Sequence, residues 1–240
     1  LAYRGLWAEA EQALDEGLRL FEKGQAIQSQ GIVWAYRSLH ALLMARENPK
    51  DKIKNLQSAI QHAQRALELA DMHGLGYPVE RDYVRAHWLL GASYRASIRS
   101  AKKMQRYSAP ELMEKAEQHL SESLRRCRAI NMVDHEAAIL LEVSKLRYAQ
   151  NEHEQALTYA QEALVITERS GYVLQGADVN LWLARLAIEG IVKRENVMRE
   201  ELAREYAQKA KELAHCDDGP PYYYKVAYEE AEALLEKLKE

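Results

Sequence analysis

Several residue types are scarce in this sequence, and each scarcity argues against a class of protein. The 240 residues include only two Cys, five Pro and 11 Gly. Cys127 and Cys216 lie far apart and match no disulfide or zinc-binding spacing, which favours a reducing, cytoplasmic setting. Pro and Gly are too few for a protein built from many hairpin turns.

A long apolar run, a targeting segment and an excess of one charge are also lacking. The sequence has no run of about 18 apolar residues, so no transmembrane helix is predicted. It also shows no signal peptide. The formal net charge of −3 provides no overall attraction to nucleic acid or to an anionic membrane. We therefore expect a cytoplasmic protein that binds neither nucleic acid nor a membrane directly.

What the sequence does contain is helix-forming residues in a repeating pattern. Ala, Leu, Glu, Arg, Lys and Gln dominate, and no stretch alternates like a strand. Five segments carry a small residue at an anchor, Ala or Leu four positions later, and a small residue seven positions later. This spacing places the three residues on one helix face. The anchors are Ala10, Ala59, Ala116, Ala156 and Ala203.

Residues suited to a helix end follow each anchor by fifteen positions. They are Gln25, Gly74, Asn131, Gly171 and Asp218, with Gly24 beside the first and Gly219 beside the last. Gly and Asn favour the left-handed conformation that ends a helix. Helices with larger residues alternate with these small-residue helices, and the clearest start at Arg85, Ala137 and Val179.

One stretch, AILLEVSKLRYAQNEHEQALTYAQEAL, resembles the tetratricopeptide repeat (TPR) without a gap. Val143 and Ser144 stand at the Leu-Gly pair of that repeat, and Ala156 follows Ser144 by twelve residues. First helices of two further repeats are indicated by His87, Leu90, Gly91 and Tyr94, and by Leu183 and Ala184. The resemblance implies an all-α fold, a right-handed α-solenoid of TPR-like helical hairpins with a C-terminal capping helix.

The resemblance divides residues 1–240 into successive units of a single TPR-like solenoid. The units are the second helix of a truncated repeat at 1–22, a repeat at 29–73, a repeat with a long first helix at 80–130, the most regular repeat at 134–170, a repeat at 175–215 and a capping helix at 222–239. Gly5 aligns with Asn151, at the turn between two helices of a repeat. We therefore expect a fragment of a longer protein, with an exposed face formed by Trp7, Ala10 and Leu14.

The long and variable repeats resemble the C-terminal sensor arrays of signal-transduction ATPases with numerous domains (STAND), which include maltose-regulon activator-like and bacterial NLR-like proteins. This resemblance implies a non-catalytic sensor module in signalling, transcription regulation or bacterial immunity. Such a module binds a protein, a peptide or a small-molecule effector and regulates an upstream NTPase domain of the same chain. The P-loop of an NTPase is not found in this sequence. The alternative is a stand-alone scaffold or chaperone adaptor that binds peptide tails.

No motif indicates catalysis, a cofactor or a metal site. The sequence has no nucleophile elbow, no Gly-rich phosphate loop and no H-E-x-x-H helix. Four ligand-type residues at 215–218, His-Cys-Asp-Asp, are adjacent in a predicted turn, and no second cluster accompanies them. We expect neither enzyme activity nor a bound cofactor or metal.

Repeat arrays of this kind bind partners on the concave face formed mainly by first helices. The inward-facing positions of the family fall on Arg85, Trp88, Arg95, Glu142, Lys145, Tyr148, Trp182 and Arg185. Trp, Tyr and Arg are also enriched in binding hot spots. For Trp88 and Trp182, packing between repeats is an equal alternative.

Two further features have open interpretations. A basic stripe lies in a stretch that is either an extended first helix or an insertion, and it consists of Arg95, Arg99, Lys102, Lys103 and Arg106. All of these except Lys102 share one face if the helix continues. The stripe is either a site for an acidic partner or a solvated face balanced by Glu114 and Glu117. The three tyrosines at 222–224 are either a binding patch or a cover for the edge of the last repeat.

Overall fold

The computed structural model describes residues 1–76, 78–104 and 106–239, and it is all-helical. No strand is found among these residues, apart from a β-bridge between His215 and Tyr222. The all-α prediction is therefore confirmed. Contacts divide the chain into two compact units, which are described separately. Unit 1 holds residues 1–2 and 6–135, and unit 2 holds residues 3–5 and 136–240.

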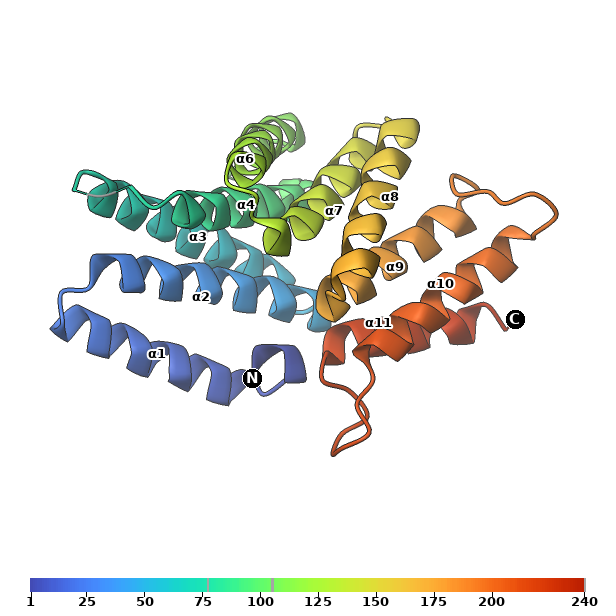
Figure 1. The fold of residues 1–240 in the computed structure, drawn as a ribbon, viewed down its shortest axis with the longest axis horizontal. Coiled ribbons are helices and arrows are strands. Elements are labelled where there is room, and N and C mark those ends of the chain that lie inside the picture. Colours follow the sequence, from blue (N-terminus) through green and yellow to red (C-terminus); the bar gives the residue numbers. More distant parts are fainter. Residues whose placement is uncertain (77, 105, 240) are drawn as a thin grey trace. The chain divides into compact units, whose positions relative to one another are not determined.

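Unit 1 is built from helices that pack against their neighbours in sequence (Figure 1). These are α1 (Trp7–Lys23), α2 (Ile27–Glu47), α3 (Lys52–Gly74), α4 (Glu80–Ser97) and α6 (Ala109–Ala129). Helix α1 packs on α2, α2 on α3, α3 on α4 and α4 on α6, and α2 also touches α4. Between α4 and α6 the chain forms a short 3-10 helix (Ile98–Ser100) and the one-turn helix α5 (Ala101–Met104).

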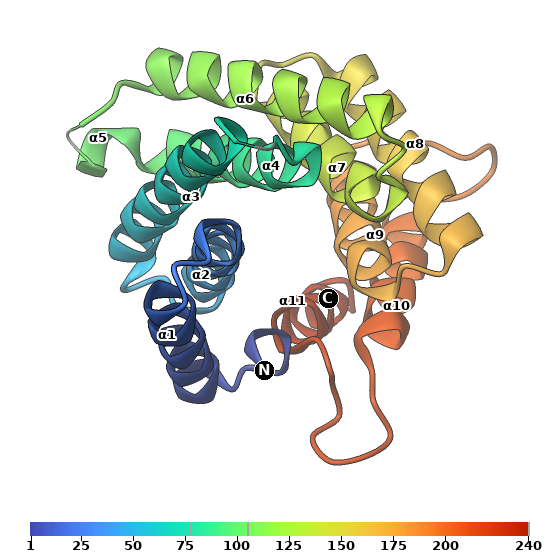
Figure 2. The same ribbon diagram turned by 60° about the vertical axis from the view of Figure 1, so that its left-hand side comes forward.

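Unit 2 has the same pattern of neighbouring helices (Figure 2). It contains most of α7 (Val133–Ala149), followed by α8 (His153–Ser170), α9 (Val173–Ile188), α10 (Arg199–Ala214) and α11 (Lys225–Lys237). Helix α8 packs on α9, α9 on α10, and α11 on both α9 and α10. Residues 3–5 also belong to this unit, and the Tyr3 ring lies edge-on to the Tyr224 ring with centroids 4.8 Å apart.

The anchors and the residues four and seven positions after them form the buried faces along which helices meet. The anchors of α3, α6, α8 and α10 are fully buried, and so are the residues four positions later. In α6 that later residue is Leu120, and the facing residue of α4 is Gly91. A Cβ on Gly91 would lie 2.5 Å from Leu120 Cγ. The small residues therefore allow the close helix approach on which both units depend.

A buried serine ties a larger-residue helix to an anchor carbonyl in each unit. Ser38 Oγ of α2 donates to the carbonyl of Ala59 at 2.9 Å, and Ser144 Oγ of α7 donates to the carbonyl of Ala156 at 2.5 Å. Ser144 stands at the Gly position of the sequence pattern. Ser38 therefore marks the equivalent position in α2.

Left-handed residues end the helices at most of the predicted positions. Gln25, Asn131 and Gly171 have φ angles of 52°, 52° and 67°. The prediction is wrong near Asp218, because α10 ends at Ala214 through the extended residue His215, and the left-handed Gly219, with φ of 88°, lies further along the loop. The prediction is wrong at Gly74, because α3 continues to that residue and leaves it through a right-handed conformation.

The helix expected to continue through the basic stripe ends at Ser97. Ser97 Oγ donates to the carbonyl of Ser93 at 2.7 Å, a back-bond that often bends helices, and a 3-10 turn follows. The stripe therefore does not lie on one continuous helix face, and residues 98–104 are a short insertion between α4 and α6.

The expected exposed face on α1 is not present. Ala10 is buried, and Trp7 and Leu14 are half-buried. The reason is that α1 packs on α2, where the Trp7 ring lies 5.7 Å from the His40 ring. Within the described ranges no helix combines the length and apolar character needed to span a membrane.

Candidate binding surface

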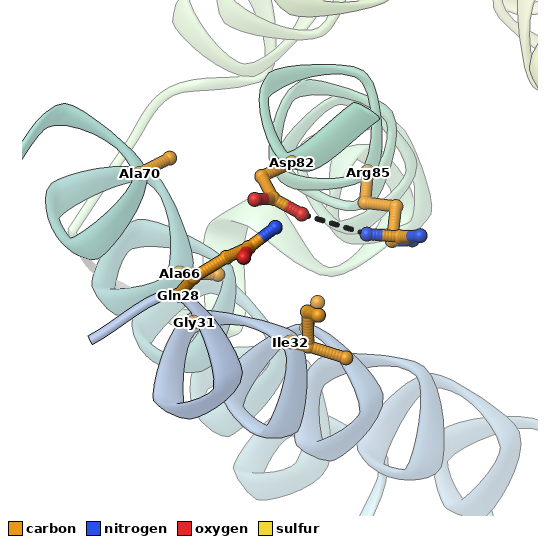
Figure 3. Close-up of a pocket in the computed structure, with 8 residues that line it drawn as sticks. Gln28, Gly31, Ile32, Ala66, Ala70, Asp82 and Arg85 are labelled. Carbon is orange, nitrogen blue, oxygen red and sulfur yellow. Dashed lines mark hydrogen bonds and ion pairs between the residues drawn. The ribbon is translucent and has the colours of Figure 1, made fainter. Parts of the chain in front are cut away.

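An open hollow in unit 1 lies beside Arg85, one of the predicted binding residues (Figure 3). Its lining includes Gln28 and Ile32 of α2, Ala66 and Ala70 of α3, and Asp82 and Arg85 of α4. The free space inside it is about that of one water molecule. Such a hollow can accept a protruding group of a partner but cannot enclose a drug-sized ligand.

Arg85 is held in place at the rim of this hollow. Its Nη1 lies 2.8 Å from Oδ1 of Asp82, one helical turn earlier on α4, and its side chain is 18 % exposed. Figure 3 shows Gln28 and Ile32 of α2 directed towards this ion pair. A guanidinium fixed by a carboxylate loses less side-chain entropy when a partner binds it.

The other two predicted residues of α4 are half-buried. The Trp88 ring meets the His135 ring edge-on with centroids 5.6 Å apart. The buried Trp88 indole N–H has no hydrogen-bond partner among the described residues. Arg95 lies two turns further along α4 and is also half-buried. The use of Arg85, Trp88 and Arg95 in binding stays a prediction.

In unit 2, two predicted residues of α7 are tied to each other. Lys145 Nζ lies 2.9 Å from Oε1 of Glu142, and Glu142 is almost fully buried. Tyr148, one turn later, donates its hydroxyl to Glu189, just past the end of α9. These side chains are therefore ordered by their own contacts, and a partner would have to compete for them.

The remaining predicted residues, Trp182 and Arg185 of α9, differ sharply in exposure. Trp182 is only 9 % exposed, and its indole N–H donates to Ser144 Oγ at 2.7 Å. Its ring also packs edge-on against Tyr148. The position of Trp182 agrees with the packing alternative. Arg185 is 51 % exposed and lies 2.9 Å from Glu230 of α11.

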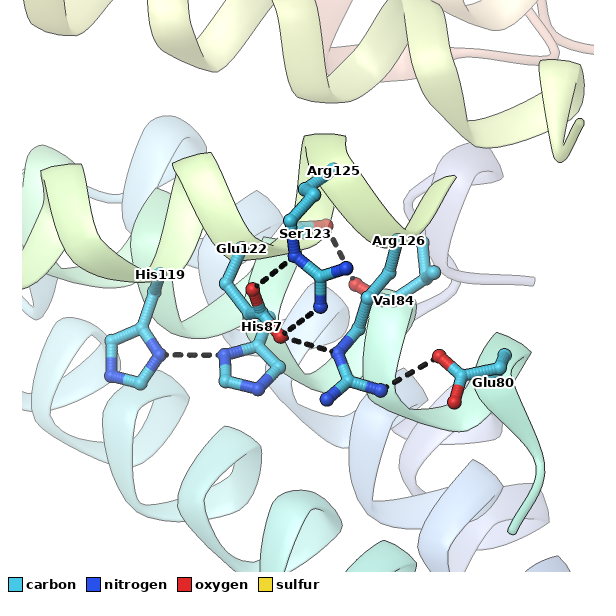
Figure 4. A network of polar contacts seen from close by, with 8 residues as sticks. All are labelled: Glu80, Val84, His87, His119, Glu122, Ser123, Arg125 and Arg126. Atoms are coloured by element: carbon cyan, nitrogen blue, oxygen red, sulfur yellow. Dashed lines mark hydrogen bonds and ion pairs between the residues drawn. The ribbon is translucent and has the colours of Figure 1, made fainter. Parts of the chain in front are cut away.

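A polar network holds α4 against α6 in unit 1 (Figure 4). Glu122 accepts hydrogen bonds from Arg125 and Arg126, and Arg126 also bonds to Glu80 at the start of α4. Hydrogen bonds from Arg125, and then from Arg126, lower the pKa of Glu122 to about 2. The network holds α4, the helix that carries Arg85, in place against α6. It therefore helps to fix the position of the candidate surface.

A histidine pair extends the same contact between α4 and α6. His87 Nδ1 and His119 Nδ1 lie 2.9 Å apart, so one ring donates and the other accepts. Burial lowers the pKa of His87, and it lowers the pKa of His119 to about 4. Both rings are therefore neutral near pH 7, a state in which one Nδ1 can donate and the other can accept.

The tyrosines at 222–224 cover other helices of unit 2. The fully buried Tyr224 donates its hydroxyl to Asp178 of α9 at 2.8 Å, and Tyr223 donates to the carbonyl of Leu213 in α10. The covering alternative is thus supported.

The ligand-type residues at 215–218 lie in the turn before these tyrosines, where His215 Nε2 lies 3.0 Å from Asp217. Among the described residues no group of three or more His, Cys, Asp or Glu side chains could hold a metal ion.

Sequence reasoning missed the residues that α2 contributes to the hollow. Gln28 and Ile32 were not assigned, because the repeat pattern was matched to the helices that start at Arg85, Ala137 and Val179 and gave no alignment for α2. The hydrogen bond from Ser38 to Ala59 supplies that alignment, because it matches the bond from Ser144 to Ala156. The signal available in the sequence was Ser38, a small polar residue at the position that corresponds to the Gly of the repeat.

Comparison with known proteins gives a fold and no family. No protein-family model and no curated protein matches the chain. Among solved structures, a similar one is the crystal structure of BtubC (BKLC) from P. vanneervenii, with a TM-score of 0.53 and 18 % sequence identity. The alignment covers 100 % of this chain and 90 % of that chain. At this identity the likeness supports a helical-repeat-like fold and says nothing about function.

Proposed function

We propose that this chain is a right-handed TPR-like solenoid that acts as a non-catalytic binding module. The alternation of larger-residue and small-residue helices supports the TPR-like architecture, and so do the two serine-to-anchor bonds. The observation that carries the binding role is Arg85, which is paired with Asp82 at the rim of an open hollow and is followed one turn later on the same helix by the half-buried Trp88. Arg and Trp at such a place are typical of interaction hot spots.

The proposed partner is a protein segment or peptide. The hollow beside Arg85 has room for about one water molecule, which argues against an enclosed small-molecule effector. A peptide can instead lie along the surface, place one side chain in the hollow and bond to Arg85 and Gln28. The fixed guanidinium favours a carboxylate or a backbone carbonyl as its acceptor.

The finer part of the proposal is a sensor role. Partner binding would favour one of two arrangements of the repeats and so change the activity of an upstream NTPase domain. This requires the partner to bind one arrangement more tightly than the other. A selected peptide should therefore change NTP hydrolysis by the full-length protein, and an unchanged rate at saturation would contradict the sensor role.

The binding role can be tested with peptides selected from a displayed library on the full chain. For a selected peptide, Arg85→Glu should raise the Kd by about tenfold or more, because attraction becomes repulsion at the hollow. Lys145→Glu and Arg185→Glu test the α7 and α9 surface of unit 2 in the same way. Isothermal titration calorimetry measures each Kd.

Arg19→Glu is the matched control. Arg19 on α1 is exposed and ion-paired one turn away with Glu16, as Arg85 is paired with Asp82. It should change the Kd by less than about twofold. If no selected peptide loses affinity in any of the three test variants, the first-helix surface is not the binding site.

A further inference from the structure

The insertion between α4 and α6 carries a cluster of cations that the candidate surface does not explain. We call Arg99, Lys102, Lys103 and Arg106 the basic bend. They lie inside residues 83–110, a stretch of the sequence with six Lys or Arg and no Asp or Glu. The whole chain has a net charge of −3, so this local excess of positive charge runs against its overall composition.

The basic bend is anchored to unit 1 and not left loose. Ala101 and Met104 of α5 are both buried, at a spacing of one helical turn. Lys102 and Lys103 lie between them and are exposed, as are Arg99 and Arg106. The two buried side chains therefore fix the backbone that presents the four cations to solvent.

The cations of the basic bend lack the acidic partners seen elsewhere. Exposed arginines such as Arg19 and Arg65 pair with a Glu one turn away. Among the described residues, Arg99, Lys102 and Lys103 form no ion pair. Glu111, the next acidic residue along the chain, is held in the capping box of α6, where it accepts from the Ser108 backbone N–H at 2.6 Å. Unpaired positive charges this close together repel each other, and an acidic partner would relieve that repulsion.

The chemistry of the bend separates three classes of anionic partner. A membrane-binding segment places apolar side chains beside its cations, but the apolar residues of the bend are buried in unit 1. Single-stranded nucleic acid needs an exposed aromatic ring for stacking. The aromatic ring at the bend, Tyr107, packs edge-on against Tyr94, and Arg106 and Lys115 lie over its faces. An acidic protein segment needs only cations that are exposed and closely spaced.

We infer that the basic bend is a docking site for an acidic segment of a partner protein. Arg99 and Arg106 can each bind a carboxylate through two N–H groups, and Lys102 and Lys103 act as point charges between them. The site is distinct from the hollow beside Arg85 and does not depend on the function proposed for it. Its affinity falls steeply with salt, because all four cations are exposed to solvent.

Fluorescence anisotropy of a labelled peptide tests this inference on the full chain. The probe has about 12 residues, most of them Asp and Glu, and a matched peptide has Asn and Gln in their place. We expect the acidic peptide alone to bind at low salt. Lys102→Glu combined with Lys103→Glu should raise its Kd by about tenfold or more.

Lys50→Glu combined with Lys54→Glu is the control, because it makes the same charge change at two exposed lysines of unit 1. This pair should raise the Kd by less than about twofold. Equal loss in both double variants would mean attraction to net charge and would overturn the site. Tighter binding to phosphatidylserine vesicles or to single-stranded DNA than to the acidic peptide would overturn the choice of partner. Thermal unfolding checks that both variants remain folded.

Discussion

At the scale of the residue, two serines in equivalent positions have unequal surroundings. Ser38 and Ser144 are both fully buried and both donate to an anchor carbonyl. Ser144 Oγ also accepts the indole N–H of Trp182, so it links three helices of unit 2. For Ser38, the bond to Ala59 is the side-chain bond observed. The buried indole N–H of Trp182 therefore depends on Ser144 for its acceptor, and among the described residues no such group depends on Ser38.

We expect Ser144→Ala to lower the free energy of unfolding by about 2–3 kcal/mol and Ser38→Ala by about 1 kcal/mol. Both lose a bond to a buried carbonyl, but only the first leaves the Trp182 N–H buried without an acceptor. Urea unfolding followed by circular dichroism measures both values. Equal losses in the two variants would show that the bond between Trp182 and Ser144 adds nothing to stability.

At the scale of the element, residue volumes on facing helices are complementary. Gly91 of α4 faces Leu120 of α6, and an added Cβ would lie 2.5 Å from Leu120 Cγ and 3.1 Å from its backbone N. In the hairpins of α2 with α3 and of α7 with α8, a serine replaces this Gly, and Ala replaces this Leu. The residue that faces the Gly is thus larger than the residues that face the two serines.

A double-mutant cycle tests this complementarity. Gly91→Ala should destabilise unit 1 by about 1–3 kcal/mol through overpacking, and Leu120→Ala by about 2–5 kcal/mol through a cavity. The double variant should lose less than the sum by about 1 kcal/mol or more, because the new methyl group occupies part of the cavity. Strictly additive losses, measured by urea unfolding, would contradict direct packing of the two residues.

At the scale of the whole molecule, unit 1 has five histidines at helix contacts whose pKa values are lowered by burial. Burial brings the pKa of His62 and of His119 to about 4 and lowers the pKa of His40, His87 and His135. Three of these rings lie against a tryptophan, as His62 does against Trp34 at 5.1 Å. The packing of the unit therefore depends on neutral imidazoles.

This arrangement predicts that unit 1 loses stability in mild acid. An unfolded histidine binds a proton near pH 6.5, whereas these buried rings resist protonation until lower pH. Stability is complete above about pH 6.5 and falls as the pH drops towards about 4, because the unfolded chain binds more protons. The urea midpoint, followed by tryptophan fluorescence, should be lower at about pH 5 than at about pH 7.5.

The histidine variants identify the source of this effect. His119→Gln removes one titrating ring, and its amide can still bond to His87, so the difference between the two midpoints should shrink. His153→Gln is the control, because His153 is exposed on α8 of unit 2. That variant should leave the difference unchanged. The opposite ranking of the two variants would rule out the buried rings as the cause.

The sequence alone determined the features that arise within one helix or one turn. The anchors Ala10, Ala59, Ala116, Ala156 and Ala203 all lie inside helices, as the spacing of small residues predicts. The left-handed ends at Asn131 and Gly171 follow from residue type, since few residues adopt that conformation at low cost. The burial of the anchors follows from helical periodicity, because residues three and four apart share a face.

Only the tertiary structure decided which side chains meet across helices. By sequence, Trp88 and Trp182 are equivalent candidates, yet Trp182 is buried on Ser144 and Trp88 is half-buried against His135. The break of α4 at Ser97 and the covering of α1 by α2 likewise depend on long-range contacts. Such contacts join residues far apart in the chain, and the spacing of residues within one helix contains no information about them.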